Sequence, residues 1–374
     1  MYKQMQFLRQ AVTMVRNQTF RLDLPKSGML SGLLLQISAD CVVGATLAGG
    51  AWRLDDFLGK VEIIGNGATI IKSYNWCDIL FLTWLHQGIV PPAQWRNYAG
   101  NTQQTWGVIL FGRYLNDPKY GLELSHWDSV EIRITNSATA AFYSNDLAVT
   151  ILQTWLREAP GSYQGYIRSE QWRQWTTVAA GIDYEVLPSE YPICTLAIQG
   201  VPAATLGMFN AHPFDLDWDI DLSKAGGTKQ IYKGGADMLL VQNYIERGSE
   251  IITGGQADLT ALRGIDVGIS EMMQWVAGAS SRAGNVATVI PTLEGDDVDG
   301  TIQFEARQVD HPIDFMVRGM GYWDFVWLLA NLTLDPDANL DPKVDGECRL
   351  NTTTRNSAGA AAGTNRILLE RVVS

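Results

Sequence analysis

The sequence lacks the features that define several classes of protein. Among its 374 residues, no run approaches the roughly 18 to 20 uncharged apolar residues of a membrane-spanning helix. The most apolar window, residues 79–85, follows Asp78 and is closed by Gly88, which favours a short helix or strand inside a core. Hydrophobic residues make up 46% of the chain and charged residues only 18%, a balance that excludes disorder. The length predicts two domains.

Cysteine is scarce and scattered. The four cysteines show neither C-x-x-C spacing nor the density of a disulfide scaffold, and no secretory signal precedes them: Cys41, Cys77, Cys194 and Cys348. We therefore expect free thiols in a protein made in a reducing compartment.

Motifs of well-known enzyme chemistry are missing too. The sequence contains no G-x-S-x-G, H-E-x-x-H or G-x-x-x-x-G-K-[ST] pattern, and its four histidines stand singly. The segment Gly65-Asn66-Gly67 lacks the third glycine of a dinucleotide fingerprint and predicts a hairpin turn instead. A net charge of −12 disfavours direct contact with nucleic acid. The sequence thus predicts neither an enzyme nor a bound cofactor.

Two acidic patterns resemble calcium ligands but are incomplete. One alternates along an expected strand and the other has loop spacing: Asp215, Asp217, Asp219 and Asp221, and then Asp335, Asp337, Asn339 and Asp341. Ile220 and Leu340 stand where a calcium loop has glycine, and neither pattern supplies the bidentate glutamate. We predict solvated loops or an interface at both places, and no metal.

Acidic residues are absent from the first 22 positions, which carry basic ones. Apolar residues recur there at steps of four, three, four and three: Met1, Met5, Leu8, Val12 and Val15. This spacing predicts a short amphipathic helix over residues 1–18, with Lys3, Arg9 and Arg16 away from its apolar stripe. Two partners remain open for such a helix. It could lie on an anionic membrane surface, with the three basic residues toward lipid, or dock on a neighbouring subunit.

Strand signals dominate the rest of the chain. Extended apolar or alternating runs in the first half, divided by Gly, Pro, Asn and Asp, amount to about eight strands, the number that a jelly roll needs. The second half repeats this style, although 238–245 is equally compatible with a helix and 259–276 is ambiguous. We place the boundary near residue 160, where Pro160 and Gly161 interrupt the pattern. The expected domains are therefore 19–160 and 161–374.

A weak internal repeat supports this division. Leu24-Pro25, followed by Leu-Leu-Leu-Gln at 33–36, returns as Leu187-Pro188, followed by Leu-Ala-Ile-Gln at 196–199. The offset is constant at 163 residues (187 minus 24, and 196 minus 33). Two unrelated hairpins remain an alternative, but the repeat favours an all-β chain of two tandem, eight-stranded jelly rolls.

Thirteen tryptophans are present. Five lie within or beside apolar runs, where a core or a subunit contact is the simplest use of their large surface: Trp76, Trp84, Trp106, Trp127 and Trp155. Trp172 and Trp175 lie in a polar stretch and are the better candidates for exposure. We predict that these two anchor an interface.

In this arrangement the chain resembles the double jelly-roll major capsid proteins of tailless icosahedral viruses with double-stranded DNA, of which the tectiviruses are typical. The resemblance is architectural and covers nearly the whole chain; its carriers are residues 1–17, 20–24, 33–37, 61–71, 76–88, 184–187 and 196–200. The segment 248–300 departs from it and leaves the strand order of the second roll open.

The resemblance implies a structural protein and not an enzyme. It implies homotrimers with a pseudo-hexagonal outline that tile the shell of a virion, synthesised in the host cytoplasm. The partners implied are further copies of the chain, penton or minor capsid proteins, and the lipids of an internal membrane. No direct contact with nucleic acid is expected.

The alternative from another class is a carbohydrate-binding or carbohydrate-active protein built of tandem β-sandwiches. Its acid and base would be paired carboxylates, such as Asp217 with Asp219 or Glu294 with Asp296. Alternate residues on one strand face lie closer together than the acid and base that flank a glycosidic bond, which weakens this interpretation.

Overall fold

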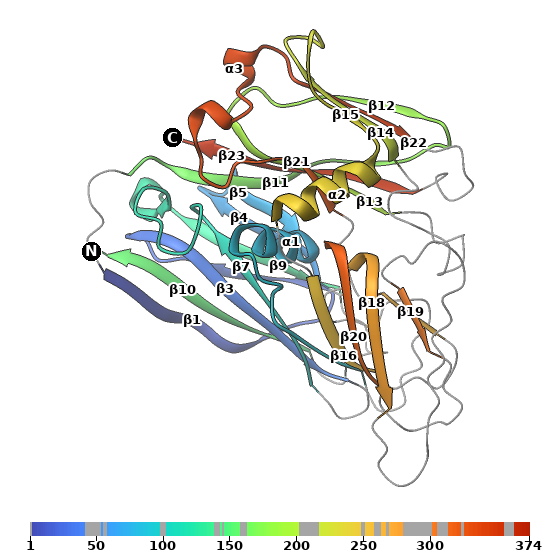
Figure 1. The fold of residues 1–374 in the computed structure, drawn as a ribbon. Coiled ribbons are helices and arrows are strands. Elements are labelled where there is room, and N and C mark those ends of the chain that lie inside the picture. Colours follow the sequence, from blue (N-terminus) through green and yellow to red (C-terminus); the bar gives the residue numbers. More distant parts are fainter. Residues whose placement is uncertain are drawn as a thin grey trace.

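A computed structural model of the chain describes fifteen stretches, and every statement below concerns these: residues 2–41, 54, 58–97, 102–137, 143, 146–157, 163–201, 217–247, 251–257, 263–266, 269–279, 301–304, 313–322, 325–354 and 363–374. Strands dominate them and carry the chain through two adjacent β-structures (Figure 1).

The first half consists of strands and one long helix. In chain order they are β1 (Tyr2–Met14), β2 (Gln18–Asp23), β3 (Met29–Asp40), β4 (Leu58–Gly65), β5 (Thr69–Asn75), α1 (Trp76–Gln87), β6 (Ala93–Asn97), β7 (Thr102–Leu110), β8 (Leu122–Glu123), the 3-10 turn η2 (Leu124–His126), β9 (Val130–Asn136) and β10 (Leu147–Arg157).

The second half repeats that order and adds further strands after its helix. It comprises β11 (Tyr166–Thr176), β12 (Ile182–Val186), β13 (Ile193–Val201), β14 (Asp217–Lys224), β15 (Lys229–Gly234), α2 (Ala236–Arg247), β16 (Ile251–Ala257), β17 (Arg263–Asp266), β18 (Ile269–Ala279), β19 (Thr301–Phe304), β20 (Ile313–Tyr322), β21 (Phe325–Ala330), η5 (Pro336–Ala338), α3 (Pro342–Asp345), β22 (Arg349–Thr354) and β23 (Thr364–Val373).

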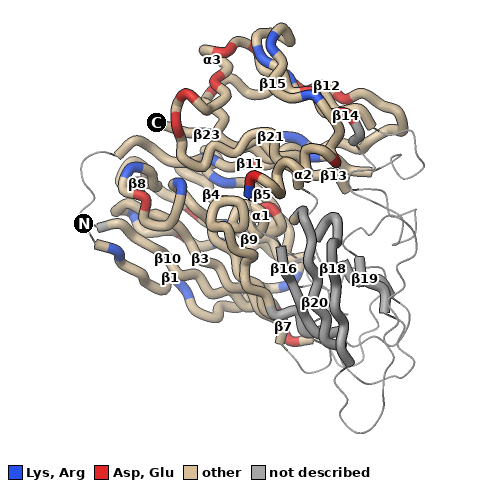
Figure 2. The backbone as a smooth tube through the Cα atoms, in the orientation of Figure 1, with Lys and Arg blue, Asp and Glu red and all other residues tan. Residues whose placement is uncertain are grey.

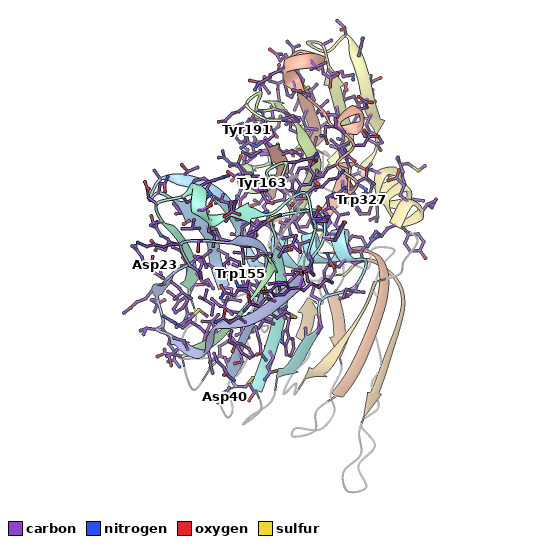
Figure 3. All side chains as sticks on the ribbon, turned by 90° about the vertical axis from the view of Figure 1, so that its left-hand side faces the viewer. Asp23, Asp40, Trp155, Tyr163, Tyr191 and Trp327 are labelled. Atoms are coloured by element: carbon purple, nitrogen blue, oxygen red, sulfur yellow. The ribbon has the colours of Figure 1, made fainter. Side chains whose placement is uncertain are left out.

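The first half folds as a jelly roll of two sheets. One sheet has the order β1-β10-β3-β7 and the other β2-β9-β4-β5, with antiparallel neighbours in both. Alternate residues of each strand point between the sheets, as Leu33, Leu35 and Ile37 of β3 do, and form one hydrophobic core. Trp155 lies in this core, within the lower roll in Figure 3.

The second half folds in the same way. One sheet has the order β11-β23-β13-β21, and the other is the four-stranded sheet β12-β22-β14-β15. A second core fills the space between them and includes Leu196, Ile198, Leu222 and Leu369. The strands that follow α2 add β16 and β18 on either side of β20, and β16 continues in parallel onto β6 of the first roll.

The two rolls correspond residue by residue at their helices. The helices α1 and α2 are both 12 residues long, and each follows the last strand of its second sheet. The Thr83 hydroxyl accepts from the Val108 N–H at 3.0 Å and donates to the Ile79 carbonyl at 2.6 Å, with the Val108 carbonyl 3.2 Å away. Asn243, 160 positions after Thr83, likewise accepts from the N–H of the strand residue Trp327 at 2.8 Å, and its amide also donates to the Trp327 carbonyl at 2.9 Å. The internal repeat therefore reflects two equivalent rolls.

The predicted hairpin at Asn66-Gly67 joins β4 to β5. Both residues have positive φ, 51° and 73°, and the Ala68 N–H donates to the Gly65 carbonyl at 3.2 Å. These values describe a type I′ turn, whose twist matches that of antiparallel strands. The apolar window 79–85 lies in α1 and is buried, and 238–245 lies in α2. The sequence was compatible with either a helix or a strand for each of these two segments, and the structure shows that both are helical.

The predicted N-terminal helix is wrong. Residues 2–14 form β1, which pairs with β10 along its whole length. Leu8 and Val12 both pack on the core, as residues four apart do on one face of a strand. Because a separation of four also fits one face of a helix, this pair matched both patterns, whereas Met5 and Val15, which completed the helical spacing, are exposed. This segment belongs to the first roll.

The predicted domain boundary near 160 falls between the end of β10 and the start of β11, outside the described residues. Strands β11, β15, β16 and β22 did not stand out in the sequence. No helix in the described part of the chain is long and apolar enough to cross a membrane. All four cysteines are free thiols in the structure, as predicted.

Candidate functional site

The junction between the two rolls is the most elaborate polar site in the described structure, and α1 builds it. The helix starts after Asn75, whose N–H donates to the Asp78 carboxylate at 2.8 Å, and ends at Gly88, whose φ of 73° suits glycine. Residues on all its sides are buried, since it packs on β7, β4 and β5 of its own roll and faces the second roll (Figure 1).

A buried ion pair joins the first turn of α1 to β23. Arg366 Nη2 lies 2.6 Å from Asp78 Oδ1, and Arg366 Nη1 donates to Asp78 Oδ2 at 3.3 Å. Arg366 also donates to Gln199 and stacks over the Phe325 ring. Burial raises the pKa of Asp78, and the Arg366 charge opposes that shift. The bidentate geometry holds the charged form of both partners.

A second buried pair joins the last turn of α1 to the same strand. His86 Nε2 lies 2.7 Å from Glu370 Oε2, and both side chains are 4% exposed. The Ser169 hydroxyl donates to Glu370 Oε1 at 2.8 Å and accepts from Lys72 Nζ at 2.7 Å. The Thr195 hydroxyl donates to Glu370 Oε2 at 2.9 Å. Glu370 is thus bound by side chains from both rolls.

Burial acts on the pKa values of Glu370 and Lys72 in different ways. Burial alone would raise the pKa of Glu370, but His86 and Lys72, together with hydrogen bonds, lower it to about 2. Burial lowers the pKa of Lys72 to about 8, and the charge of Glu370 limits that shift. A cavity with room for about one water molecule lies beside these groups, lined in part by Lys72, His86, Ser169 and Glu370.

Aromatic packing fills the space between the two ion pairs. The rings of Phe81 and Phe325 stack with their centroids 4.3 Å apart, and Trp84 meets Trp327 edge-on at 5.6 Å. Trp327 lies at the junction in Figure 3. These residues of the second roll, together with Ala197 and Leu368, belong to the first roll's core cluster. The junction is therefore a continuous part of that core.

Backbone pairing continues the junction at the strand edges. The edge of β5 pairs in parallel with the edge of β11, with Lys72 opposite Ser169 and Ser73 opposite Glu170. Beyond this pairing, Arg371 binds Glu170, and Arg168 Nη2 donates to the same carboxylate at 3.0 Å. Figure 2 shows Lys or Arg positions and Asp or Glu positions near one another around β5 and β11, between the rolls. The arrangement can hold two rolls in one orientation.

The predicted membrane-facing residues lie apart from the junction, on and beside β1. Lys3 and Arg9 are exposed, whereas Arg16 is half-buried. The Arg16 guanidinium donates to the Tyr143 carbonyl at 2.7 Å and lies 3.5 Å from Asp146. The structure thus leaves Lys3 and Arg9 accessible and engages Arg16 within the chain.

The predicted interface residues Trp172 and Trp175 lie on β11. Trp172 is 37% exposed, and its Nε1 donates to Glu185 Oε1 at 3.0 Å. Trp175 is half-buried against the second core, with the Arg173 guanidinium over its ring. Their use in an interface stays a prediction.

Three residues of the acidic patterns have structural roles within the chain. Asp335 caps η5 by accepting from the Asp337 N–H, and Asp341 caps α3 by accepting from the Lys343 N–H. Asp221 accepts from Gln230 on the neighbouring strand. Asp215, Glu294 and Asp296 lie outside the described residues. Within the described part of the chain, no three His, Cys, Asp or Glu side chains gather as metal ligands would.

Sequence reasoning missed the charged residues of the junction. A signal existed, because Lys72 follows Ile70-Ile71 and Glu370 follows Leu368-Leu369, so both interrupt apolar strand runs. A charged side chain in a buried strand is stable only when a partner neutralises it or hydrogen-bonds to it. Such an interruption therefore indicates a buried polar contact.

Comparison with known proteins gives a match at the level of fold. No family model matches the chain, and no curated protein matches its sequence. A chain in the atomic structure of Sulfolobus turreted icosahedral virus matches with a TM-score of 0.62 at 9% identity, covering 99% of this chain and 90% of that one. The crystal structure of the STIV major capsid protein matches with a TM-score of 0.59 at 9% identity, covering 99% and 97%. The chain has the double jelly-roll fold.

A bacteriophage protein shows the same likeness. The major capsid protein P2 of bacteriophage PM2 matches with a TM-score of 0.50 at 11% identity, covering all of this chain and 98% of that one. The predicted fold class, two tandem jelly rolls, is confirmed apart from the N-terminal helix. The matches to these three structures cover at least 99% of this chain.

Proposed function

We propose that this chain is the major capsid protein of an icosahedral virus and forms the shell of the virion. The observation that carries the proposal is the presence of two equivalent rolls, joined rigidly by buried ion pairs, in a fold shared with viral major capsid proteins. A shell needs rigid units that present several similar sides to their neighbours. Its function lies in contacts between copies, and catalysis has no part in it.

Three copies would form the building block. Each chain supplies two similar rolls, so a ring of three chains has six similar sides and a pseudo-hexagonal outline that tiles a shell. Further copies are the main partners, with penton or minor capsid proteins at positions where the lattice changes symmetry. The chain would be synthesised in the host cytoplasm and reside in the virion.

Size-exclusion chromatography with light scattering tests this assembly. We expect a species of three times the 41.3 kDa chain mass at micromolar concentration and moderate salt. A strictly monomeric species at every protein and salt concentration would overturn the proposal. Binding of oligosaccharides or hydrolysis of a glycoside would instead support the carbohydrate alternative.

For a virion with an internal membrane, we propose that the first strand faces lipid. The exposed basic residues Lys3 and Arg9 stand beside the exposed apolar residues Tyr2, Met5 and Phe7. Figure 2 shows basic positions without acidic ones along β1. Each basic group near an anionic surface contributes about 1 kcal/mol, which becomes substantial when an array presents many copies.

Co-flotation with anionic liposomes tests the lipid contact. Assembled protein should float at low salt and less at high salt, and a Lys3→Gln/Arg9→Gln variant should lose most of this binding. Arg21→Gln serves as the matched control, since Arg21 is exposed on β2. Flotation that neither salt nor the double substitution changes would contradict a contact through β1.

A further inference from the structure

One face of the second roll is covered by the first roll within the same chain. A row of apolar side chains crosses this face and points away from the second core: Leu368 on β23, Ala197 on β13 and Trp327 on β21. Together with Phe325 they pack in the first core cluster, against α1. The central strands β23 and β13 are therefore buried on both faces over most of their length.

The equivalent row of the first roll is uncovered. Strand pairing places Leu152 opposite Leu34, and Leu34 opposite Val108. In the second roll, the same three positions are occupied by Leu368, Ala197 and Trp327, respectively. All three first-roll residues are only half-buried. The first roll thus presents an apolar row where the second roll receives a helix.

The second helix, in turn, leaves uncovered the face that α1 uses. Asp78 and Phe81 of α1 contact Arg366 and Phe325 of the second roll. Their equivalents on α2, 160 positions later, are Met238 and Val241, which are exposed by 65% and 38%. Ile245, one turn further on, is 71% exposed. A helix in water would not normally carry an apolar stripe on its outer face.

The strand edges show the same imbalance. Within the chain, the free edge of β5 meets the free edge of β11. The equivalent edges are those of β15 and β1, and among the described residues each of these strands pairs on one side only. An exposed edge and an exposed apolar stripe are both typical of surfaces that another chain covers.

We infer that the junction inside the chain is repeated between copies. The stripe of α2 (Met238, Val241 and Ile245) packs on the uncovered row of the first roll (Leu34, Val108 and Leu152) of a second copy, and the edge of β15 lies beside β1 of that copy. This inference rests on the proposed capsid function and names the surface through which copies meet.

The contact joins unlike surfaces head to tail, because α2 belongs to the second roll and the row to the first. Such a contact closes into a ring when the rotation between successive rolls divides a full turn. Around such a ring, the junction between the two rolls of one chain alternates with the similar contact between neighbouring copies. All rolls in the ring are then in equivalent surroundings. A second copy is the occupant that fits, since the chain already contains one example of this contact.

Light scattering of a Val241→Lys variant tests the contact. The lysine would lie in an apolar interface, and we expect at least about a tenfold rise in the concentration at which trimers dissociate. Val344→Lys is the matched control: Val344 is 83% exposed on α3, away from both surfaces, and its replacement should leave assembly unchanged. Thermal unfolding should show that both variants fold like the parent protein.

Cross-linking tests which surfaces meet. Phe81 and Phe325 stack within the chain, and their equivalents are Val241 on α2 and Trp106 on β7. In the inferred contact, Val241 of one copy lies near Trp106 of the next. A Val241→Cys/Trp106→Cys variant treated with a short bismaleimide should therefore give covalent dimers and trimers. Each single variant, which retains the four native thiols, is the control and should give neither.

The outcomes separate the two proposals. A parent protein that never trimerises overturns the capsid assembly itself. A trimer that tolerates Val241→Lys and gives no cross-link between these positions overturns the inferred surface and leaves the capsid proposal standing.

Discussion

The equivalent sheets of the two rolls differ in their surroundings. In the second roll, every residue of β13 from Ile193 to Gly200 is buried, because one face packs on its own core and the other on the first roll. In the first roll, β3 alternates buried and half-buried residues from Leu33 onward, because only one face has a partner within the chain. The two rolls share one fold, but the pattern of buried residues in equivalent strands differs because different structures surround them.

This contrast explains where buried charges occur. A strand buried on both faces normally reads as a continuous apolar run. In the second roll Arg366 and Glu370 interrupt that run, and each finds its partner on α1. The equivalent positions of the first roll, Thr150 and Thr154, carry no charge, and in the described part of the chain no helix stands against them as α1 does against Arg366 and Glu370. Charge in these strands therefore serves the junction.

The largest expected effect breaks the junction at Glu370. A Glu370→Gln variant leaves Lys72 and His86 buried without a carboxylate, which should cost about 3 to 5 kcal/mol in the free energy of unfolding. Urea unfolding measures the change. Glu347→Gln is the control, since Glu347 pairs with Arg349 at the surface and should cost less than about 1 kcal/mol. Equal effects of the two substitutions would contradict the role given to Glu370.

Equivalent helix positions should respond unequally to the loss of a side chain. Phe81→Ala removes a fully buried ring that stacks on Phe325 and should cost about 3 to 5 kcal/mol. Val241→Ala on α2 should change the stability of the dissociated chain by no more than about 0.5 kcal/mol. Chemical unfolding at low protein concentration compares them. A large effect of Val241→Ala in the monomer would show that α2 is already covered.

Acid should weaken the junction through the protonation of Glu370. The pKa of Glu370 is about 2 in the folded chain and near 4.5 in the unfolded one, so the stability that it contributes is complete above pH 4.5. That contribution, about 3 kcal/mol, is lost as the pH falls from about 4.5 to about 2. Unfolding measured across this range should show a shallower pH dependence in Glu370→Gln. Identical profiles would contradict the assignment.

A smaller loss is expected for a feature that the rolls share. Thr83→Val and Asn243→Leu each remove a side chain that accepts from the backbone N–H of one strand residue, Val108 or Trp327. Because the roles are equivalent, each should cost about 1 to 3 kcal/mol. Thermal unfolding compares them with the parent. A large cost in one roll and none in the other would deny the equivalence.

The sequence predicted the elements whose signals are local. The Asn66-Gly67 turn, the buried window 79–85 and the alternating strands of the first half depend on residues close together in the chain. Prediction failed where the local residue pattern does not indicate how the strand pairs and which of its residues are buried. In β1, the separation of Leu8 and Val12 by four residues fits a helix face as well as a strand face, and in β22 the buried positions include Thr352 and Thr354, so the strand has no apolar alternation.

The junction was beyond prediction for a different reason. His86 and Glu370 are 284 residues apart, and the contact between Arg366 and Asp78 spans 288. A single sequence shows that a charge interrupts an apolar strand, but it does not show which distant residue neutralises it. The predicted candidates Lys3, Arg9 and Arg16 lie on and beside β1, apart from this junction, and Trp172 reaches only its margin, where its ring lies under the Arg371 guanidinium.

Electron microscopy of the purified protein tests the central claim most directly. The claim is that three chains assemble through contacts that copy the junction within each chain. Class averages should show a threefold particle with six similar lobes, and the Val241→Lys variant should yield single two-lobed particles. Six lobes that persist in the variant would place the contact elsewhere, and two-lobed particles alone in the parent protein would contradict the claim.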